Sequence, residues 1–199
     1  MGAHMHDHAR FRSEWAERLN DPRRLEDQVS ETDLARLLAL DGDEDLIDLG
    51  SGTGFYTNRM AAWTTGTVYA VELQPEIAEL HRARGVPANV RLVTGDIAQL
   101  TLPPDSADVA VCIAVYHEVE GKLDLAALAR TLRRGGRLVI IDWRSDPDSW
   151  ENGPPAALRF STDQAAQSLP PYFRTTLVEN LGRFMFAVAG IREEQTPRP

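Results

Sequence analysis

The sequence predicts an α/β fold in which helices cover both faces of a mostly parallel sheet of seven strands. Between residues 46 and 142, short apolar runs alternate with segments of helical periodicity, a pattern typical of buried parallel strands joined by crossover helices. Two more strand-like segments near the C-terminus are joined by Asn180-Leu181-Gly182, which is too short for a crossover. We therefore expect an antiparallel hairpin at the sheet edge.

Size and composition favour one globular domain. The 199 residues can build a substantial core and are few for two domains. Hydrophobic residues make up 43% and charged residues 26%, as in ordinary soluble domains. The net charge of -9 argues against a broad electrostatic grip on nucleic acid or anionic lipid. The single cysteine, Cys112, excludes an intramolecular disulfide and a four-cysteine zinc site.

The termini and apolar runs suggest where the protein acts. No run of about 18 apolar residues predicts a membrane span, and no signal-type segment opens the chain, so we expect a cytoplasmic protein. Residues 1–7 read as an expression-tag remnant, which explains the alternating His4, His6 and His8 better than a metal site does. We expect no metal, and one domain over residues 8–199. The oligomeric state stays open, with a homodimer as one option.

Residues 8–43 are expected to form a helical cap. Phe11, Trp15 and Leu19 are spaced by four residues, as on one helix face. Asn20-Asp21-Pro22 interrupts that helix, and another is expected to begin near Ser30 or Thr32. The apolar stripe of the second helix consists of Leu34, Leu37, Leu38 and Leu40.

The remaining elements follow from the change of period along the chain. The predicted strands are 46–49, 67–71, 90–93, 107–115, 137–142, 172–178 and 183–189, and the predicted helices are 56–63, 75–84 and 123–132. We expect Gly135 and Gly136 to cap the last of these helices. Residues 143–159, rich in proline and glycine, are expected to form a long loop, after which Ser161 begins a short helix.

A glycine-rich segment follows the first predicted strand. Glycines tolerate positive φ and let a ligand lie against bare backbone. Ligands of open α/β sheets bind where the carboxyl ends of the strands open into a crevice. The candidate binding residues here are Asp48, Gly50, Ser51, Gly52, Thr53 and Gly54.

The next two strand ends carry acidic residues. Glu72 can accept hydrogen bonds from two ribose hydroxyls, a feature that nicotinamide enzymes share. Asp96, preceded by Gly95, can accept from an adenine amino group while Ile97 packs on the ring. Dinucleotide binding usually requires a third glycine where this chain has Phe55, so the spacing favours a nucleoside cofactor without a pyrophosphate.

These motifs resemble those of the class I S-adenosylmethionine-dependent methyltransferases, and most closely the small ubiquinone/menaquinone-biosynthesis type. The segment Asp48 to Gly54 is similar to that family's first motif, Glu72 to its ribose-binding acid, and Gly95-Asp96-Ile97 to its adenine-edge motif. Leu132 to Leu138 resembles the stretch before the fifth strand, with Arg134 in place of a proline. The resemblance extends over nearly the whole chain from about His8.

The resemblance implies a Rossmann-like seven-stranded sheet and S-adenosylmethionine as methyl donor, with S-adenosylhomocysteine as product. It adds Tyr56, Leu73 and Ala114 to the cofactor-binding candidates, although Tyr56 could equally pack on the first helix. Trp15, Asp21-Pro22 and Arg23 resemble N-terminal helices that cover the cofactor in some relatives.

Methyl transfer needs few catalytic groups, because the sulfonium carbon is already electrophilic. The catalytic candidates follow the fourth predicted strand: His117 as a proton acceptor and Tyr116 beside the sulfonium. An equally open interpretation is that His117 and Glu118 only orient the next helix.

Substrate-binding candidates lie near the ends of the fourth and fifth strands. They are Glu118, Asp142, which could bind a substrate cation or support the loop, and Trp143. An aromatic pocket of Trp143, Trp150, Phe160, Tyr172 and Phe173 is weighed against simple core packing. Arg133, Arg134 and Arg137 are expected to form a solvated cap and not a nucleic-acid patch.

The function predicted from the sequence is methyl transfer to a small-molecule acceptor, with nucleic acid not expected as a substrate. One alternative is a non-catalytic S-adenosylmethionine-binding scaffold or partner subunit. Another is a nicotinamide oxidoreductase, against which Phe55 and Gly95-Asp96 argue. The acceptor atom, whether oxygen, nitrogen, carbon or sulfur, stays open.

Overall fold

The computed structural model describes residues 16–146 and 153–193. The predictions for residues 1–7, for the histidines and Trp15 near the N-terminus, and for Trp150 lie outside the described residues. Within the described residues, no helix has the length and apolar character needed to cross a bilayer.

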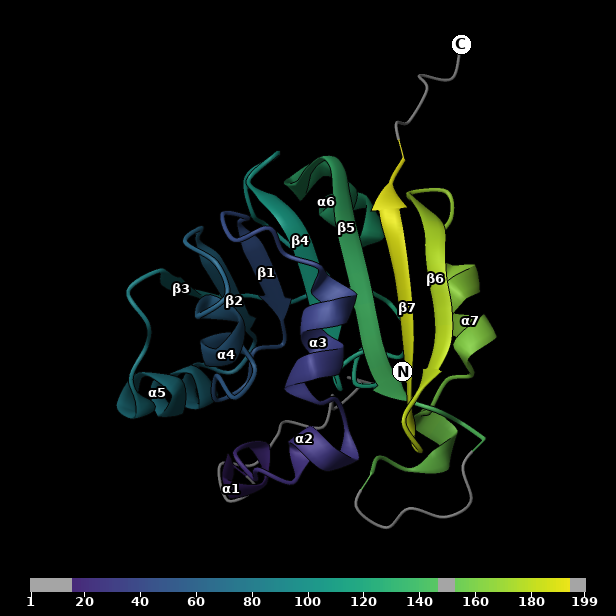
Figure 1. Cartoon of the computed structure of the whole chain (residues 1–199), viewed down its shortest axis with the longest axis horizontal. Helices are drawn as coiled ribbons and strands as arrows, with labels where there is room; N and C mark the ends of the chain where they lie inside the picture. Colours follow the sequence, from purple (N-terminus) through teal and green to yellow (C-terminus); the bar gives the residue numbers. More distant parts are fainter. Residues whose placement is uncertain (1–15, 147–152, 194–199) are drawn as a thin grey trace, which may run out of the picture.

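Seven strands form one sheet in the order β3-β2-β1-β4-β5-β7-β6 (Figure 1). The strands are β1 (Leu46–Leu49), β2 (Val68–Glu72), β3 (Val90–Thr94), β4 (Ala107–Ile113), β5 (Leu132–Trp143), β6 (Phe173–Leu181) and β7 (Met185–Arg192). Strands β1 to β5 pair in parallel, whereas β7 is antiparallel to both β5 and β6. The predicted mostly parallel sheet with a C-terminal hairpin is confirmed.

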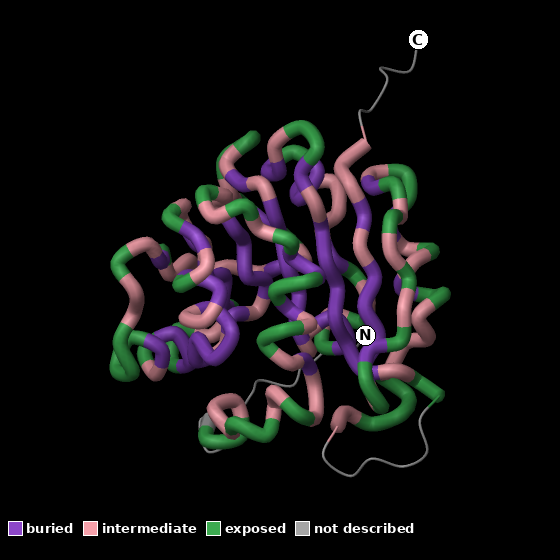
Figure 2. The backbone as a smooth tube through the Cα atoms, viewed as in Figure 1, coloured by how far each residue is buried: buried purple, intermediate pink, exposed green. Residues whose placement is uncertain are grey.

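Helices cover both faces of the sheet, as predicted. They are α1 (Ala16–Leu19), α2 (Arg24–Asp27), α3 (Glu31–Leu38), α4 (Thr57–Ala61), α5 (Pro75–Arg84), α6 (Leu125–Thr131) and α7 (Thr162–Ser168), with a 3-10 turn at Ala156–Leu158. Helices α3 and α4 share one apolar cluster with the sheet, and α6 and α7 share the other. The central strands are therefore buried on both sides (Figure 2).

Side-chain caps set several helix boundaries. The Ser30 hydroxyl accepts a hydrogen bond from the Asp33 amide at 3.0 Å and begins α3, at one of the two positions predicted. Ser161 forms a capping box with Gln164 at the start of α7. At the other end of α3, the Arg137 guanidinium donates to the Leu38 carbonyl at 2.7 Å, where the helix dipole favours a cation.

The prediction that Gly135 and Gly136 cap a helix is wrong. Helix α6 ends at Thr131, and β5 begins at Leu132 with a register irregularity opposite Ala107 and Val109. The glycines form this bulge, where Gly135 takes a φ of +78°. Nor is Arg133 merely solvated, because its guanidinium bridges Asp45 and Asp108 at 2.7 and 2.6 Å.

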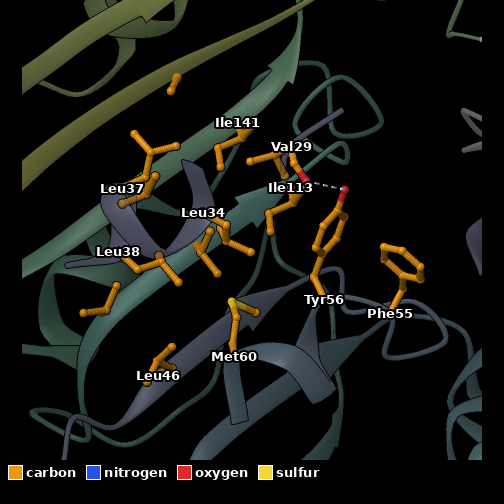
Figure 3. Packing of buried hydrophobic residues seen from close by; sticks show 14 of the residues in the cluster. Val29, Leu34, Leu37, Leu38, Leu46, Phe55, Tyr56, Met60, Ile113 and Ile141 are labelled. Atoms are coloured by element: carbon orange, nitrogen blue, oxygen red, sulfur yellow. Dashed lines mark hydrogen bonds between the residues drawn. The ribbon is translucent and has the colours of Figure 1, made fainter. Parts of the chain in front are cut away.

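In the described part of the N-terminal cap, from residue 16 on, three short helices end at Leu38, so helical structure does not continue to residue 43. Figure 1 shows α1 and α2 beyond the carboxyl ends of the parallel strands. The Tyr56 hydroxyl donates to the carbonyls of Arg24 and Val29 at 3.1 and 3.5 Å, the second of which is drawn in Figure 3. Thr53 donates to the Asn20 side chain at 2.6 Å, so the cap is docked on the loop after β1.

Candidate cofactor-binding and active site

The loop that follows β1, from Gly50 to Gly54, depends on its glycines. Gly50, Gly52 and Gly54 have φ values of +77°, +57° and +82°, a region that residues with a Cβ rarely adopt. The amides of Gly50 and Ser51 both donate to the Val71 carbonyl at 2.9 Å, which fastens the loop to the end of β2. The loop is thus fixed at the carboxyl edge of the sheet, where Gly50, Ser51 and Gly52 line a cleft.

An open cleft of about 560 Å³ lies against this loop. Its walls come from the ends of β1, β2 and β4 and from the N-terminal cap. The lining residues are Leu19, Arg24, Asp48, Gly50, Ser51, Gly52, Tyr56, Glu72, Gln74, Ile77, Ile113, Ala114, Val115 and Glu118. Eight of the predicted cofactor or substrate residues are therefore brought together here: Asp48, Gly50, Ser51, Gly52, Tyr56, Glu72, Ala114 and Glu118.

Glu72 at the end of β2 joins the glycine loop to the next turn. Its carboxylate accepts from the Gly52 amide at 3.0 Å and from the Gln74 amide at 2.9 Å. Burial raises the pKa of Glu72, and these backbone hydrogen bonds oppose the rise. Each carboxylate oxygen retains a second lone pair that can accept from a ribose hydroxyl.

Arg24 of α2 brings a cation into the cleft. Its guanidinium donates to the Leu19 carbonyl at 2.6 Å and lies 4.8 Å from the centre of the Tyr56 ring. Among the described residues, no carboxylate forms an ion pair with Arg24. Burial lowers the pKa of Arg24, and the Tyr56 hydroxyl and Asp48 partly offset this. A half-buried guanidinium without a carboxylate partner is suited to an anionic ligand group.

Two further polar groups at the base of the cleft have hydrogen-bonding capacity that no described residue uses. Asp48 is buried and accepts from the Thr57 hydroxyl at 2.6 Å, and desolvation raises its pKa to about 6. The Ser51 hydroxyl is buried, and no described residue gives it a hydrogen-bond partner. Buried polar groups are normally paired, so these two groups and Arg24 indicate that a polar ligand belongs in the cleft.

The remaining loop and edge residues lie beside the cleft and not in its lining. Thr53 is held by Asn20, and Gly54 packs against His81, whose ring lies 2.2 Å from an added Cβ. At the end of β3, the Asp96 carboxylate accepts from the Ala98 amide at 2.8 Å. Gly95 and Ile97 lie at the same strand end. Next to Glu72, Leu73 is an apolar side chain left 53% exposed.

Strand β4 ends earlier than predicted. It stops at Ile113, and Ala114 takes a φ of +54°, an uncommon conformation for alanine that turns the chain at the cleft. Tyr116 is 2% exposed, contacts Phe160 and donates to the Ser168 hydroxyl at 3.0 Å. The structure therefore places Tyr116 in the core beside α7 and outside the cleft lining, and a position beside the sulfonium stays a prediction.

His117 and Asp142 meet across the ends of β4 and β5. The His117 Nδ1 atom lies 2.9 and 3.1 Å from the two carboxylate oxygens of Asp142. Asp142 is fully buried, so a substrate cation does not reach it without displacing its partners. Burial lowers the pKa of His117, but the charge and hydrogen bond of Asp142, aided by Glu118, raise it above the ordinary value overall.

Glu118 borders the cleft beside this pair. Its side chain is exposed to the open cleft, yet the surrounding protein displaces enough water to raise its pKa to about 7. Positive charge on His117 opposes that rise, while Glu72 and Asp142 add to it. A cation bound in the cleft would favour the ionised form of Glu118.

The predicted aromatic pocket does not form as one group. Trp143 packs in the cluster that contains α3 and α4, whereas Phe160, Tyr172 and Phe173 belong to the cluster on the other face of the sheet. The alternating directions of strand side chains separate them. The described aromatic residues therefore serve core packing.

Sequence reasoning missed six residues that line the cleft. They are Leu19, Arg24, Gln74, Ile77, Ile113 and Val115. The signal for Arg24 was a cation directly after Asp21-Pro22-Arg23, in the segment expected to cover the cofactor. The apolar residues carried no comparable signal, because an apolar side chain at a strand end is usually core.

Comparison with known proteins agrees with this geometry. Residues 47–140 match the family described as "Methyltransferase domain". A crystal structure of a SAM-dependent methyltransferase from Aquifex aeolicus superimposes with a TM-score of 0.81 at 25% identity, covering 92% of this chain and 100% of that one.

Curated relatives match over shorter stretches. An O-methyltransferase from Penicillium expansum is 36% identical over 115 residues, covering 53% of this chain and 41% of that protein. A demethylmenaquinone methyltransferase from Clavibacter sepedonicus is 30% identical over 123 residues, covering 61% of this chain and 50% of that protein. The chain spans half or less of the length of the curated relatives it matches.

The order of the strands and the superposition show that the chain has the fold of a SAM-dependent methyltransferase. Residues 47–140 are similar to the methyltransferase-domain family. The resemblance seen in the sequence is thereby confirmed.

Proposed function

We propose that this chain transfers a methyl group from S-adenosylmethionine to a small-molecule acceptor in the cytoplasm. The observation that carries the proposal is a set of polar groups in one cleft that can still bind a ligand. They are the Arg24 guanidinium, which forms no ion pair with a described carboxylate, the Ser51 hydroxyl, which has no described partner, and the Glu72 carboxylate, which has lone pairs left over. A zwitterionic amino acid joined to a nucleoside supplies a complementary group to each of them.

In this proposal the chain's own residues hold three parts of the ligand. Glu72 accepts hydrogen bonds from the ribose hydroxyls. Leu73 and Ile97 flank the adenine, and Asp96 accepts a hydrogen bond from its amino group. Arg24 binds the methionine carboxylate, and the bare backbone of the loop from Gly50 to Gly54 lies beneath the methionine chain. The donor supplies an electrophilic methyl carbon, and the cleft holds it in line with the acceptor.

The acidic cleft favours this ligand for a second reason. Asp48, Glu72 and Glu118 all line it, and the net charge of the chain is -9. S-adenosylmethionine carries a positive sulfonium, so the local field attracts it. The same field disfavours a polyanionic acceptor such as nucleic acid, which supports a small-molecule acceptor.

Binding calorimetry with S-adenosylhomocysteine tests the proposal. Gly52→Val should abolish binding, because its side chain would enter the cleft, where the nearest described atom to an added Cβ is Leu19 Cδ1 at 3.6 Å. Glu72→Ala should weaken binding by about 1–3 kcal/mol through lost hydrogen bonds. Glu76→Ala removes an exposed carboxylate one turn further along and should leave binding unchanged.

Unaltered binding in both cleft variants would contradict the proposed site. Because Glu72 also holds the Gly52 amide, thermal unfolding must be measured for Glu72→Ala without ligand. A non-catalytic scaffold remains the second candidate, and release of S-adenosylhomocysteine from S-adenosylmethionine with any acceptor would eliminate it.

A further inference from the structure

The cleft lining contains three carboxylates, and Glu118 is the one that no described residue binds. Asp48 accepts from the Thr57 hydroxyl, and Glu72 accepts from two backbone amides. The Glu118 carboxylate, by contrast, has no hydrogen bond or ion pair with any described residue. The Ser51 hydroxyl, in a residue that is 8% exposed, lines the same cleft and also has no described partner. Both groups are therefore available to a ligand.

The charges of the lining do not balance. Besides the three carboxylates it contains one cation, the Arg24 guanidinium, so two negative charges are left over when all four groups are ionised. The pair of His117 and Asp142, which lies behind the lining, adds no net positive charge. S-adenosylmethionine carries one positive charge overall, because its ammonium and carboxylate offset each other and its sulfonium remains. With the donor bound, one negative charge in the cleft is therefore still uncompensated, and such a charge is costly where water is excluded.

Under the proposed function, the donor has a use for two of the carboxylates. Glu72 faces the ribose, and Asp48, directly before the glycine loop on which the methionine chain rests, can take the methionine ammonium. Glu118 follows β4 and interacts electrostatically with Glu72, at the end of β2, and with Asp142, at the end of β5. No group of the donor is assigned to this part of the cleft, so the Glu118 carboxylate is left for the acceptor.

We propose that the methyl acceptor carries a cationic nitrogen group and that Glu118 binds this group and so determines acceptor specificity. This inference rests on the proposed function. A protonated or quaternary nitrogen has no lone pair, so it cannot attack the methyl carbon. The acceptor therefore has two separate parts: a cation that anchors it at Glu118, and a nucleophilic atom that reaches the methyl group. An anionic acceptor is repelled by the same carboxylate.

The proposal determines how acceptor binding depends on pH. The loss of water around Glu118 raises its pKa, the charge of His117 lowers it, and the charges of Glu72 and Asp142 raise it again, to about 7. Glu118 is therefore mostly neutral at about pH 6 and mostly ionised at about pH 8. A ligand whose positive charge does not change with pH should bind several-fold more tightly at the higher pH.

Two probes of equal shape test the anchor without knowledge of the natural acceptor. Choline has a permanently charged nitrogen, and dimethylbutanol has a neutral carbon in its place. Each is titrated by calorimetry into the full chain saturated with S-adenosylhomocysteine, so no methyl transfer takes place. At about pH 8 we expect choline to bind about 5- to 10-fold more tightly than dimethylbutanol, and this preference should shrink at about pH 6.

Three variants assign the preference to one side chain. Glu118→Gln should remove the preference for choline and most of its pH dependence, and Glu118→Lys should make dimethylbutanol the better ligand. Both changes are at an exposed side chain, and thermal unfolding shows whether each variant is folded. The matched control is Glu120→Gln, because Glu120 is exposed and pairs with Lys122 at 2.5 Å outside the cleft lining. This control should bind both probes as the wild type does.

Equal affinities for the two probes in the wild type, or no binding of choline, would overturn the proposal. So would a Glu118→Gln variant that loses affinity for S-adenosylhomocysteine but not for methylthioadenosine, because Glu118 would then bind the donor's ammonium. Binding of S-adenosylhomocysteine to the wild type separates the two levels of inference. If it does not bind, the proposed function fails. If it binds while the probes show no difference, only the assignment of a cationic acceptor fails.

Discussion

The glycines of the loop after β1 serve two different purposes. Gly52 has only Leu19 Cδ1 near the position of an added Cβ, at 3.6 Å, so its missing side chain leaves room for a ligand. Gly54 has the His81 ring at 2.2 Å, so its missing side chain leaves room for the protein's own packing. His81 is buried and lies 2.8 Å from the Asn58 side chain, which holds the ring in place. One motif thus combines a binding requirement with a folding requirement.

Alanine substitutions should separate these two purposes. Gly54→Ala should lower the free energy of unfolding by about 1–3 kcal/mol more than Gly52→Ala, because it alone overpacks a buried ring. Gly52→Ala should be the variant that loses affinity for S-adenosylhomocysteine. Chemical denaturation and calorimetry measure the two effects. Removing the ring in Gly54→Ala/His81→Ala should recover part of the lost stability, and a purely additive double mutant would contradict the packing account.

At the scale of elements, the short helices α1 and α2 complete a cleft that the sheet leaves open. Three bonds dock them on the loop and on α4: Thr53 to Asn20, and Tyr56 to the carbonyls of Arg24 and Val29. A helix of four residues, such as α2, is not stable by itself, so docking must determine its position. Arg24 is the residue that α2 contributes to the cleft lining, and we propose that its guanidinium binds the ligand carboxylate.

Arg24→Leu should weaken binding of S-adenosylhomocysteine by about 1.5–3 kcal/mol, the usual value of a hydrogen bond to a charged group. Methylthioadenosine lacks the amino-acid carboxylate, so its affinity should stay the same in this variant. Isothermal calorimetry with both ligands makes the comparison. Arg23→Leu, whose guanidinium pairs with Asp21 at 2.6 Å, is the neighbouring control. Equal losses for both ligands would show that Arg24 supports the helices and does not bind the carboxylate.

The elements also show what sequence patterns can predict. Strands β1 to β4 were predicted to within about two residues because each carries a short apolar run, which is buried on both faces in β1 and β4. The start of β5 was not predicted, because Gly135 and Gly136 suit a helix cap and a bulge equally well. In the site, Glu72 and the glycine loop could be predicted from local motifs. The hydrogen bond between His117 and Asp142 could not, because it joins residues 25 positions apart that the pairing of β4 with β5 brings together. Only the register of β4 and β5 reveals it.

For the whole molecule, ionisable groups in the cleft make ligand binding depend on pH. The pKa of Glu118 is raised to about 7 and that of Asp48 to about 6, in both cases mainly because the surrounding protein displaces water from the carboxyl group. A carboxyl group whose folded-state pKa exceeds its unfolded value stabilises the free protein less as pH rises between the two values. The free protein should therefore lose this contribution from about pH 4 to pH 7, while a bound cation favours the ionised groups.

Affinity for S-adenosylmethionine should consequently rise several-fold between pH 5.5 and pH 8, relative to that for S-adenosylhomocysteine, which lacks the sulfonium charge. Loss of the His117 proton over the same pH range also favours the cationic donor. The variant Glu118→Gln separates the effect of His117 from that of Glu118, because it should reduce the pH dependence but not eliminate it. Calorimetry across pH gives both affinities. A constant ratio would show that neither group senses the sulfonium.

The central claim, that three strand ends and α2 enclose an adenosyl amino acid, is tested most directly by a crystal structure with S-adenosylhomocysteine. We predict the ribose hydroxyls at the Glu72 carboxylate, the adenine between Leu73 and Ile97, and the terminal carboxylate at the Arg24 guanidinium. An empty cleft at saturating ligand, or a ligand bound elsewhere on the chain, would contradict the account.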